Sequence, residues 1–210
     1  LKGLSVRNLQ ESYNDALYYR DEVRQQFLHG KLSLRQRTVG ERIFWATIMR
    51  IAQLKEKLPH PLKDLSPVDS VLSDIYYANC SVFQSLPDAW AIDQLFPVMP
   101  LHRLGEQPTR KGIFSDITCD SDGVMDQFVD LRDVRHTLPL HSLKKSEPYY
   151  IGIFLVGAYQ EILGDLHNLL GDTTVVHVSS TDKGYVIDKT IGGDTVMEVL
   201  AYVQFTRDGI

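Results

Sequence analysis

The chain has 210 residues, of which 43% are hydrophobic and 23% charged, and its formal net charge is −5 at pH 7. This length is enough for one large domain or two small ones with a buried core. The mild acidity, without a clustered basic face, argues against nucleic-acid binding, and no apolar run is long enough to cross a membrane.

Helical signals dominate the first third of the sequence. A glycine at position 30 suits the end of a first helix, whose apolar stripe is Val6, Leu9, Tyr13, Ala16, Val23 and Phe27. Ser33 with Gln36 three residues later is typical of a capping box. A second helix would begin there and end before Pro59, with a stripe of Ile43, Ala46, Ile51, Leu54 and Leu58. A shorter third helix begins around Ser66-Pro67. These features predict a small helical bundle.

After about residue 79 the pattern indicates a β-rich region, so the predicted domains are 1–78 and 79–210 and the fold class is α+β. Two helices interrupt the strands, one at Tyr159–Leu170 and one at Asp194–Phe205 with Asp194 as N-cap. Pro97 and Pro100 make the second strand an edge or interrupted strand. The predicted strands are Cys80–Gln84, Leu95–Leu104, Gly112–Thr118, Val124–Val129, His136–Ser142, Tyr149–Val156, Thr174–Ser179 and Gly184–Ile191.

Both ends of the sequence suggest a piece of a longer protein. It begins with Leu1 rather than with methionine, and its last six residues follow a helical pattern without a clear stop signal. We therefore expect further chain in the complete protein.

The run Asp116-Ile117-Thr118-Cys119-Asp120-Ser121-Asp122-Gly123 is the most informative part of the sequence. A strand would deliver a thiol and carboxylates to a turn that ends in glycine. A thiol beside carboxylates stays protonated at neutral pH, so Cys119 is a poor nucleophile and a usable proton donor. The alternatives are a buried core thiol, a turn thiol without a role, or a redox thiol. With Cys80 as the only other cysteine, free thiols in a reducing compartment are favoured over a disulfide framework.

Other site motifs fail on spacing. A calcium loop that starts at Asp120 would put Met125 where glycine is needed. The seven histidines do not pair at ligand spacing on a helix. The sequence also lacks a nucleophile-elbow serine, a phosphate loop and a dinucleotide fingerprint. We therefore predict no metal site from the residues themselves.

The second informative segment is Gly157-Ala158-Tyr159-Gln160, which follows the apolar stretch 150–156. Small residues there allow a close approach of the backbone, and Tyr159 would start a helix. A phenol at a helix N-terminus suits a phosphate ligand. A core tyrosine bonded to a backbone carbonyl is the alternative.

Taken together, the Cys119-Asp120 and Gly157-Ala158-Tyr159 motifs resemble the fold-type III, pyridoxal-phosphate-dependent amino-acid decarboxylases. The runs 90–97, 116–123 and 157–168 are most similar to the bacterial biosynthetic arginine decarboxylases, and so is the helical opening around Leu9-Gln10-Glu11-Ser12-Tyr13. The resemblance implies a helical insertion followed by a β-barrel or sandwich domain like the carboxy-terminal domain of alanine racemase. It also implies a (β/α)₈ barrel, with the cofactor-binding lysine, outside this chain. Lys111, Lys144, Lys145 and Lys183 are poor candidates for that lysine.

The resemblance assigns roles to individual residues. Cys119 would donate the proton that replaces the departing carboxylate, across a dimer interface. Asp120 and, less directly, Asp122 would bind the substrate guanidinium, and Tyr159 would bind the pyridoxal phosphate. The family implies a cytoplasmic homodimer or homotetramer that makes agmatine for polyamine synthesis, with Mg²⁺ as a further ligand of the family. Without the barrel, the piece alone is expected to be inactive.

Two rival interpretations stay open. The first is a decarboxylase of the same fold that acts on ornithine, lysine or diaminopimelate. The second is a non-catalytic oligomerisation module that keeps these motifs only as structural remnants.

Overall fold

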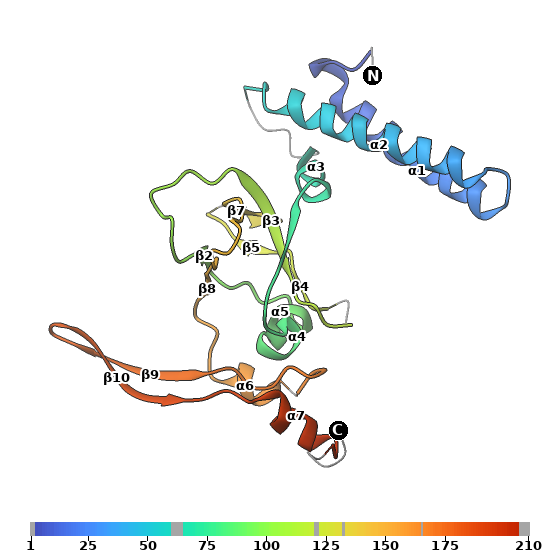
Figure 1. Cartoon of the computed structure of the whole chain (residues 1–210). Coiled ribbons are helices and arrows are strands. Elements are labelled where there is room, and N and C mark those ends of the chain that lie inside the picture. The colour runs from blue at the N-terminus through green and yellow to red at the C-terminus, as the bar shows by residue number, and fades with distance from the viewer. Residues whose placement is uncertain (1–2, 60–64, 120–121, 132, 165, 206–210) are drawn as a thin grey trace. The chain divides into compact units, whose positions relative to one another are not determined.

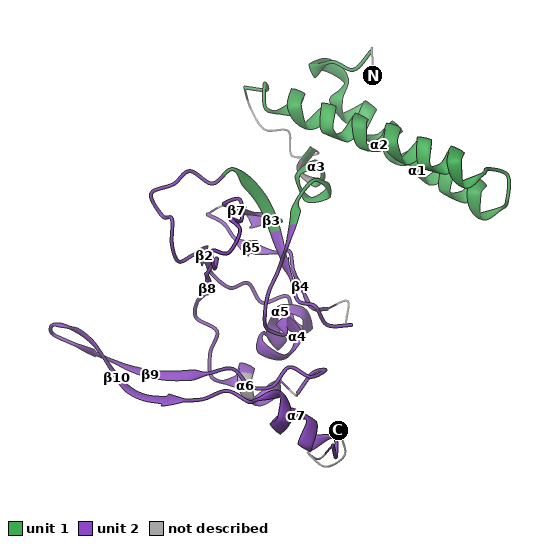
Figure 2. Ribbon diagram, viewed as in Figure 1, with its two compact units in different colours: residues 1–74, 109–112 green, residues 75–108, 113–210 purple. Residues whose placement is uncertain are grey.

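The structure is a computed structural model that describes residues 3–59, 65–119, 122–131, 133–164 and 166–205 (Figure 1). Two compact units divide it: residues 1–74 with 109–112 form unit 1, and residues 75–108 with 113–210 form unit 2 (Figure 2). In the described residues, no helix is long and apolar enough to span a bilayer. The division into domains at residue 78 stays a prediction.

Two long antiparallel helices make up most of unit 1. A short 3₁₀ turn, η1 (Val6–Asn8), leads into α1 (Leu9–Leu28), and α2 covers Leu34–Lys55. Gly30 has a φ of +70°, a left-handed conformation that glycine adopts at little cost after a helix. The capping box of Ser33 and Gln36 is present at the start of α2. The predicted helix end at Gly30 and the predicted start of the second helix at Ser33 are confirmed.

The core of unit 1 lies between α1, α2 and α3 (Ser66–Val71). Its buried members are Leu9, Tyr13, Phe44, Ile48, Ile51, Leu54, Leu65 and Val68. The predicted stripe on α2 was wrong at Ile43, which is 60% exposed, while its neighbour Phe44 is buried. Both residues are apolar, so the spacing alone could not decide which of them faces α1. Arg20 and Arg24 of α1 both donate to Glu41 of α2 across the helix pair.

Unit 2 contains short antiparallel strand pairs in place of one continuous sheet. The largest sheet has the order β1 (Asp74–Tyr77), β3 (Arg110–Ser115), β4 (Val124–Met125), with β7 (Leu138–Leu140) also paired to β3. The remaining strands pair as β2 (Val98–Pro100) with β8 (Ile151–Ile153), β5 (Phe128–Val129) with β6 (Val134–Arg135), and β9 (Val175–Thr181) with β10 (Gly184–Ile191). Four short helices accompany them: α4 (Val82–Ser85), α5 (Pro87–Ala91), α6 (Tyr159–Leu163) and α7 (Val196–Tyr202).

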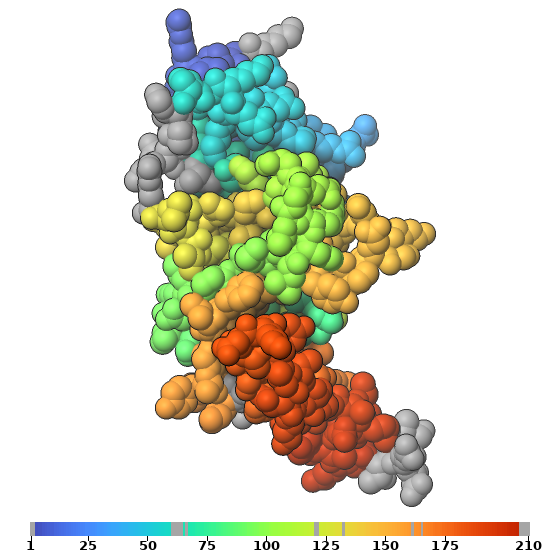
Figure 3. Space-filling model, turned by 90° about the vertical axis from the view of Figure 1, so that its left-hand side faces the viewer, coloured from blue at the N-terminus to red at the C-terminus, as the bar shows by residue number. Residues whose placement is uncertain are grey.

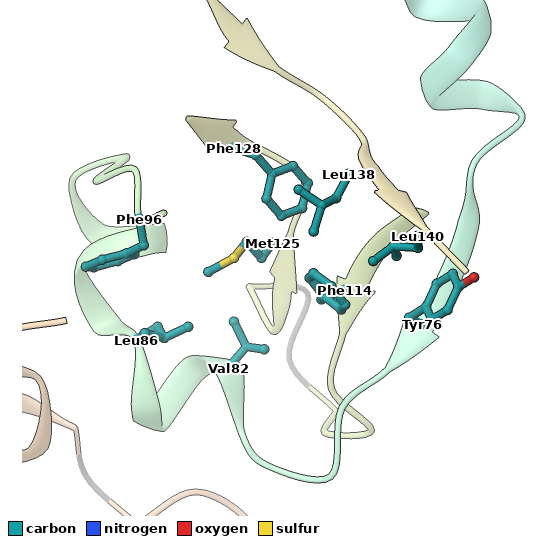
Figure 4. Packing of buried hydrophobic residues seen from close by; sticks show 9 residues of the cluster. All are labelled: Tyr76, Val82, Leu86, Phe96, Phe114, Met125, Phe128, Leu138 and Leu140. Atoms are coloured by element: carbon teal, nitrogen blue, oxygen red, sulfur yellow. The ribbon is translucent and has the colours of Figure 1, made fainter. Parts of the chain in front are cut away.

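The core of unit 2 joins the largest sheet to α4 and to the segment that follows α5 (Figure 4). Its buried members are Tyr76, Val82, Leu86, Phe96, Phe114, Met125, Phe128, Leu138 and Leu140. The Tyr76 hydroxyl donates to the His141 carbonyl at 2.9 Å, which satisfies a phenol at the edge of this apolar cluster.

By contrast, the β9–β10 hairpin is largely exposed, and its atoms appear in orange to red in Figure 3. Apolar side chains alternate on one of its faces: Val176, Val178, Tyr185 and Ile187. The predicted strand Gly184–Ile191 is confirmed residue for residue.

Several predicted elements in unit 2 were wrong. Cys80–Gln84 contains helix α4 and no strand, because the Ser81 hydroxyl accepts from the Gln84 amide and caps a helical turn. Val124–Val129 is divided into β4 and β5, which pair with different partners. β1, β6 and α5 were missed.

Both predicted helices of unit 2 are shorter than expected. α6 ends at Leu163, not at Leu170, and Gly164 follows it with extended backbone. The N-cap of α7 is Thr195 rather than Asp194, in a capping box with Glu198. The side chain of Asp194 instead accepts from the Asp172 amide at 3.0 Å. Helices in the first unit and short strands in the second confirm the α+β fold class, and the described residues do not form a (β/α)₈ barrel.

Candidate functional site

The turn that carries Cys119 connects β3 to β4. Phe114 pairs with Met125 and Ser115 with Val124, so the chain enters and leaves the turn on two adjacent antiparallel strands. The Asp116 amide donates to the Gly123 carbonyl at 2.8 Å and closes the loop at its base. Cys119 is exposed near the far end of this loop. The predicted position of the thiol on a turn after a strand is confirmed.

A buried carboxylate holds this turn in place. Asp116 is 4% exposed, and its Oδ1 accepts from the Thr118 amide at 3.0 Å and the Thr118 hydroxyl at 2.6 Å. Its Oδ2 accepts from the Val82 amide at 2.7 Å and the Phe83 amide at 3.5 Å. Burial by itself would raise the pKa of Asp116, but these hydrogen bonds outweigh it and lower the pKa below its ordinary value. Asp116 therefore ties the Cys119 turn to the first turn of α4.

Gly123 is required by the same carboxylate. A Cβ atom at this position would lie 2.2 Å from Asp116 Oδ1, closer than any real contact allows. The glycine that ends the motif therefore allows the backbone to pass against the buried acid. The sequence pattern assigns no role to Asp116, because the burial of this carboxylate depends on α4, in a region that the pattern predicts as a strand.

Asp120 lies outside the described residues, and Asp122 is exposed on the same turn. The Cys119 thiol donates to Asn168 Oδ1 with a sulfur–oxygen distance of 3.5 Å. Asn168 lies a few residues after α6, so the Cys119 turn and the segment that follows Gly157-Ala158-Tyr159 meet in unit 2. Within the described part of the chain, no hydrogen bond or ring contact joins Cys119 to Tyr159 itself.

The Gly157–Tyr159 segment enters α6 through a left-handed glycine with a φ of +63°. A Cβ atom at Gly157 would meet nothing within 4 Å, so its backbone faces open space. Tyr159 is the first residue of α6 and its side chain is 74% exposed. The alternative of a core tyrosine is therefore wrong, and the phenol is available to a ligand.

The neighbouring Gln160 anchors α6. It is 3% exposed, its Oε1 accepts from the Asp88 amide at 3.1 Å, and its Nε2 donates to the Asp88 carboxylate. At the end of the helix, a Cβ on Gly164 would lie 2.0 Å from the Gln84 carbonyl oxygen. A close approach to α4 therefore requires this glycine. Gln160 turns inward while Tyr159 turns outward.

A cavity of about 780 Å³ adjoins this segment, entirely within unit 2. The residues that line it include Cys80, Gly157, Ala158 and Gln160. Burial, with a further contribution from the Asp116 charge, raises the pKa of the Cys80 thiol. Cys80 is therefore a partly buried cysteine beside the cavity, whereas Cys119 is exposed.

The phenol of Tyr159 is an exposed hydrogen-bond donor of the kind that a phosphate accepts from. The four lysines that are poor candidates for the cofactor lysine are all exposed: Lys111, Lys144, Lys145 and Lys183. Lys111 pairs with Asp69 at 3.1 Å, and Lys144 with Glu147 at 3.7 Å. Exposed lysines do not meet the need of a Schiff-base lysine for desolvation. Across the described ranges, no group of three or more histidine, cysteine or acidic side chains is placed to hold a metal.

Comparison with known proteins places this geometry in context. Residues 1–66 match the family model described as the arginine decarboxylase helical bundle domain. The whole chain is 53% identical to the biosynthetic arginine decarboxylase of Thermosynechococcus vestitus, covering 33% of that protein. It is 51% identical, over 97% of its length, to that of Phocaeicola vulgatus, covering 32% of that protein.

A solved structure agrees with these relatives. The crystal structure of the biosynthetic arginine decarboxylase from Campylobacter jejuni matches 98% of this chain and 32% of its own, with a TM-score of 0.74 and 32% identity. The chain spans about one third of the length of the relatives it matches. The resemblance found in the motifs is therefore confirmed: along essentially its whole length, this chain is homologous to a segment of the biosynthetic arginine decarboxylases.

Proposed function

We propose that this chain is part of a pyridoxal-phosphate-dependent decarboxylase that converts L-arginine to agmatine and carbon dioxide. The observation that carries the proposal is an exposed Cys119 on a braced turn, in a chain about half identical to proteins named biosynthetic arginine decarboxylase. The balance of the reaction requires a proton donor, because a proton must replace the carboxylate that leaves the α-carbon as carbon dioxide. The cofactor, when bound, supplies the electron sink for breaking that carbon–carbon bond.

Cys119 supplies this proton in our proposal. Its thiol is exposed and hydrogen-bonded as a donor, so it holds a transferable proton at the surface of unit 2. Asp116 fixes the backbone of the turn, so the sulfur keeps a defined position. General acid catalysis depends on such positioning as well as on protonation state. The thiol would act in the active site of a second subunit.

The remaining roles concern binding. Tyr159 would donate its hydroxyl to the cofactor phosphate, next to the open backbone at Gly157. Asp120 would accept hydrogen bonds from the substrate guanidinium, a planar donor that two carboxylate oxygens match well. Asp122 would contribute on the same turn, by holding it or by pairing across the dimer rather than by direct contact.

The complete protein would join this chain to a barrel that carries the cofactor lysine, in a homodimer or homotetramer. Its product, agmatine, would feed polyamine synthesis in the cytoplasm, with Mg²⁺ as a further ligand by resemblance to the family. On this proposal the 210 residues alone do not decarboxylate arginine.

A substrate panel tests the proposal. The full-length protein is supplied separately with arginine, ornithine, lysine and diaminopimelate, and carbon dioxide release is measured. We expect arginine to be preferred by about 100-fold or more. A site that binds a guanidinium group loses hydrogen bonds to its carboxylates when the substrate is ornithine, lysine or diaminopimelate, which lack that group. Equal turnover of ornithine or lysine would support the rival decarboxylase, and no turnover of any of the four would support the oligomerisation module.

Asp120→Ala then tests the assignment of the substrate carboxylate. We expect the KM for arginine to rise about 30-fold while cofactor affinity changes little, because a charge-assisted pair is lost. Asp126→Ala, which removes an exposed carboxylate just beyond β4, is the matched control and should leave both quantities unchanged. Equal losses of arginine and cofactor binding would mean that Asp120 is structural.

A further inference from the structure

Asn168 is the one partner of the Cys119 thiol that the described residues supply. Its backbone has a φ of +58°, in the left-handed region that asparagine, aspartate and glycine tolerate better than other residues. Its side-chain oxygen accepts from Cys119 Sγ at 3.5 Å. An amide oxygen does not take up a proton near neutral pH. It therefore accepts the hydrogen bond from the thiol while the proton stays on sulfur.

The segment that carries Asn168 is fixed by its neighbour His167. The His167 amide donates to Gln84 Oε1 at 3.4 Å, and its Nδ1 lies 3.4 Å from the Ser81 hydroxyl. The imidazole ring also packs on Phe83, with 4.6 Å between ring centroids. All three contacts are made to α4 or to its N-cap.

The same short helix holds the other side of the pair. The amides of Val82 and Phe83 donate to the Asp116 carboxylate, which fixes the Cys119 turn. The thiol and its acceptor are therefore both tied to α4, one through Asp116 and one through His167. Because both segments are bonded to α4, the tertiary structure determines the distance between Cys119 Sγ and Asn168 Oδ1, although both residues are exposed.

We propose that Asn168 is a positioning residue for Cys119: its side-chain oxygen orients the S–H bond and keeps the proton on sulfur until the substrate takes it. The inference rests on the proposed function of Cys119 as proton donor. The hydrogen bond to Asn168 Oδ1 fixes the direction of the S–H bond. The proposal therefore predicts two quantities: the alkylation rate of Cys119 and the ratio of agmatine formed to carbon dioxide released.

Alkylation of the full-length protein tests the contact without reference to catalysis. Cys119 is modified with iodoacetamide at neutral pH, its rate is followed by peptide mass spectrometry, and Cys80 serves as internal reference. Asn168→Gly keeps the left-handed backbone but removes the acceptor, so Cys119 should react about threefold faster. Asn168→Asp keeps an acceptor and adds a negative charge, so Cys119 should react more slowly than in the parent. A purely structural role for Asn168 would move both variants in the same direction, and that result would overturn the inference.

Product analysis separates this inference from the proposed function. Arginine labelled in its carboxyl group gives the carbon dioxide released, chromatography of the same reaction gives the agmatine formed, and the two together give their ratio. We expect Asn168→Gly to lower the ratio about threefold and Asn168→Asp to keep it near one. If Cys119→Ala leaves the ratio at one, the donor role of Cys119 fails. If Cys119→Ala lowers it and Asn168→Gly does not, the donor role stands and the role of Asn168 is rejected.

Discussion

The two motif segments of unit 2 are built in opposite ways. The Cys119 turn is closed at its base and held by the buried carboxylate of Asp116, which accepts four hydrogen bonds. The Gly157–Tyr159 segment has an open glycine and a tyrosine that is 74% exposed, and the helix that follows is anchored through Gln160. One segment is braced by this chain, and the other presents a free functional group.

This difference is informative about chemistry. A proton donor must hold its atom in one place, and the brace of Asp116 supplies that condition within these residues. A phosphate ligand needs several donors, and Tyr159 supplies one of them. The comparison therefore predicts large effects on product formation at the Cys119 turn and smaller effects on cofactor affinity at Tyr159.

The largest expected effect is that of Cys119→Ala in the full-length protein. Agmatine formation should fall about 100-fold while carbon dioxide release persists, because the proton is then added to a carbon of the cofactor instead of the α-carbon. The measurement is the ratio of agmatine, quantified by chromatography, to labelled carbon dioxide released from carboxyl-labelled arginine. An unchanged ratio would assign the proton to another group and remove the contrast between the two segments.

The next largest effect is expected for Asp116→Asn. We expect the free energy of unfolding to fall by about 2 kcal/mol, because the amide cannot accept all four hydrogen bonds that the carboxylate accepts. Urea titration of both proteins at pH 7 gives this difference. If the variant is as stable as the parent, the buried brace contributes nothing.

The same pair of proteins has a predicted pH dependence. The folded-state pKa of Asp116 lies below its ordinary value of 3.8. The stability it confers is therefore complete above that value and is lost as the pH falls through the lowered folded-state pKa. The difference between parent and Asp116→Asn should be constant from pH 5 to 7 and should shrink below pH 3.8.

Tyr159→Phe should have a smaller effect. Loss of one hydroxyl donor should weaken pyridoxal phosphate binding about tenfold, with little change in turnover at saturating cofactor. Titration of the cofactor-free protein, followed by the absorbance of the bound cofactor, measures this. Tyr185→Phe, on the exposed face of β10, is the matched control and should bind the cofactor like the parent. A fall in turnover with unchanged affinity would contradict the phosphate role.

The smallest effect is expected in unit 1. Ser33→Ala removes the N-cap of α2 and its capping box with Gln36, which should cost about 1 kcal/mol of unfolding free energy. The ratio of agmatine to carbon dioxide should stay at one, because this helix start carries no group of the proposed reaction. Ser33→Asp, which keeps a capping side chain, should restore the lost stability.

Sequence reasoning succeeded where the signal is local. Ser33 with Gln36, Gly30, and the turn that delivers Cys119 each depend on residues within a few positions of one another, and the structure has them as predicted. The sequence does not determine whether Tyr159 is exposed, because a tyrosine at a helix start is compatible both with ligand binding and with burial in the core.

Tertiary structure decided the rest. Cys80–Gln84 has the composition of a strand, yet Ser81 caps a helical turn there, and the amides of that turn bind Asp116, more than 30 residues away. Likewise, Asn168 lies within hydrogen-bond distance of Cys119 because its neighbour His167 is bonded to Gln84 of that helical turn. Local order follows from neighbouring residues because short-range hydrogen bonds need no distant partner, whereas a buried carboxylate is stable only where the fold brings donors to it.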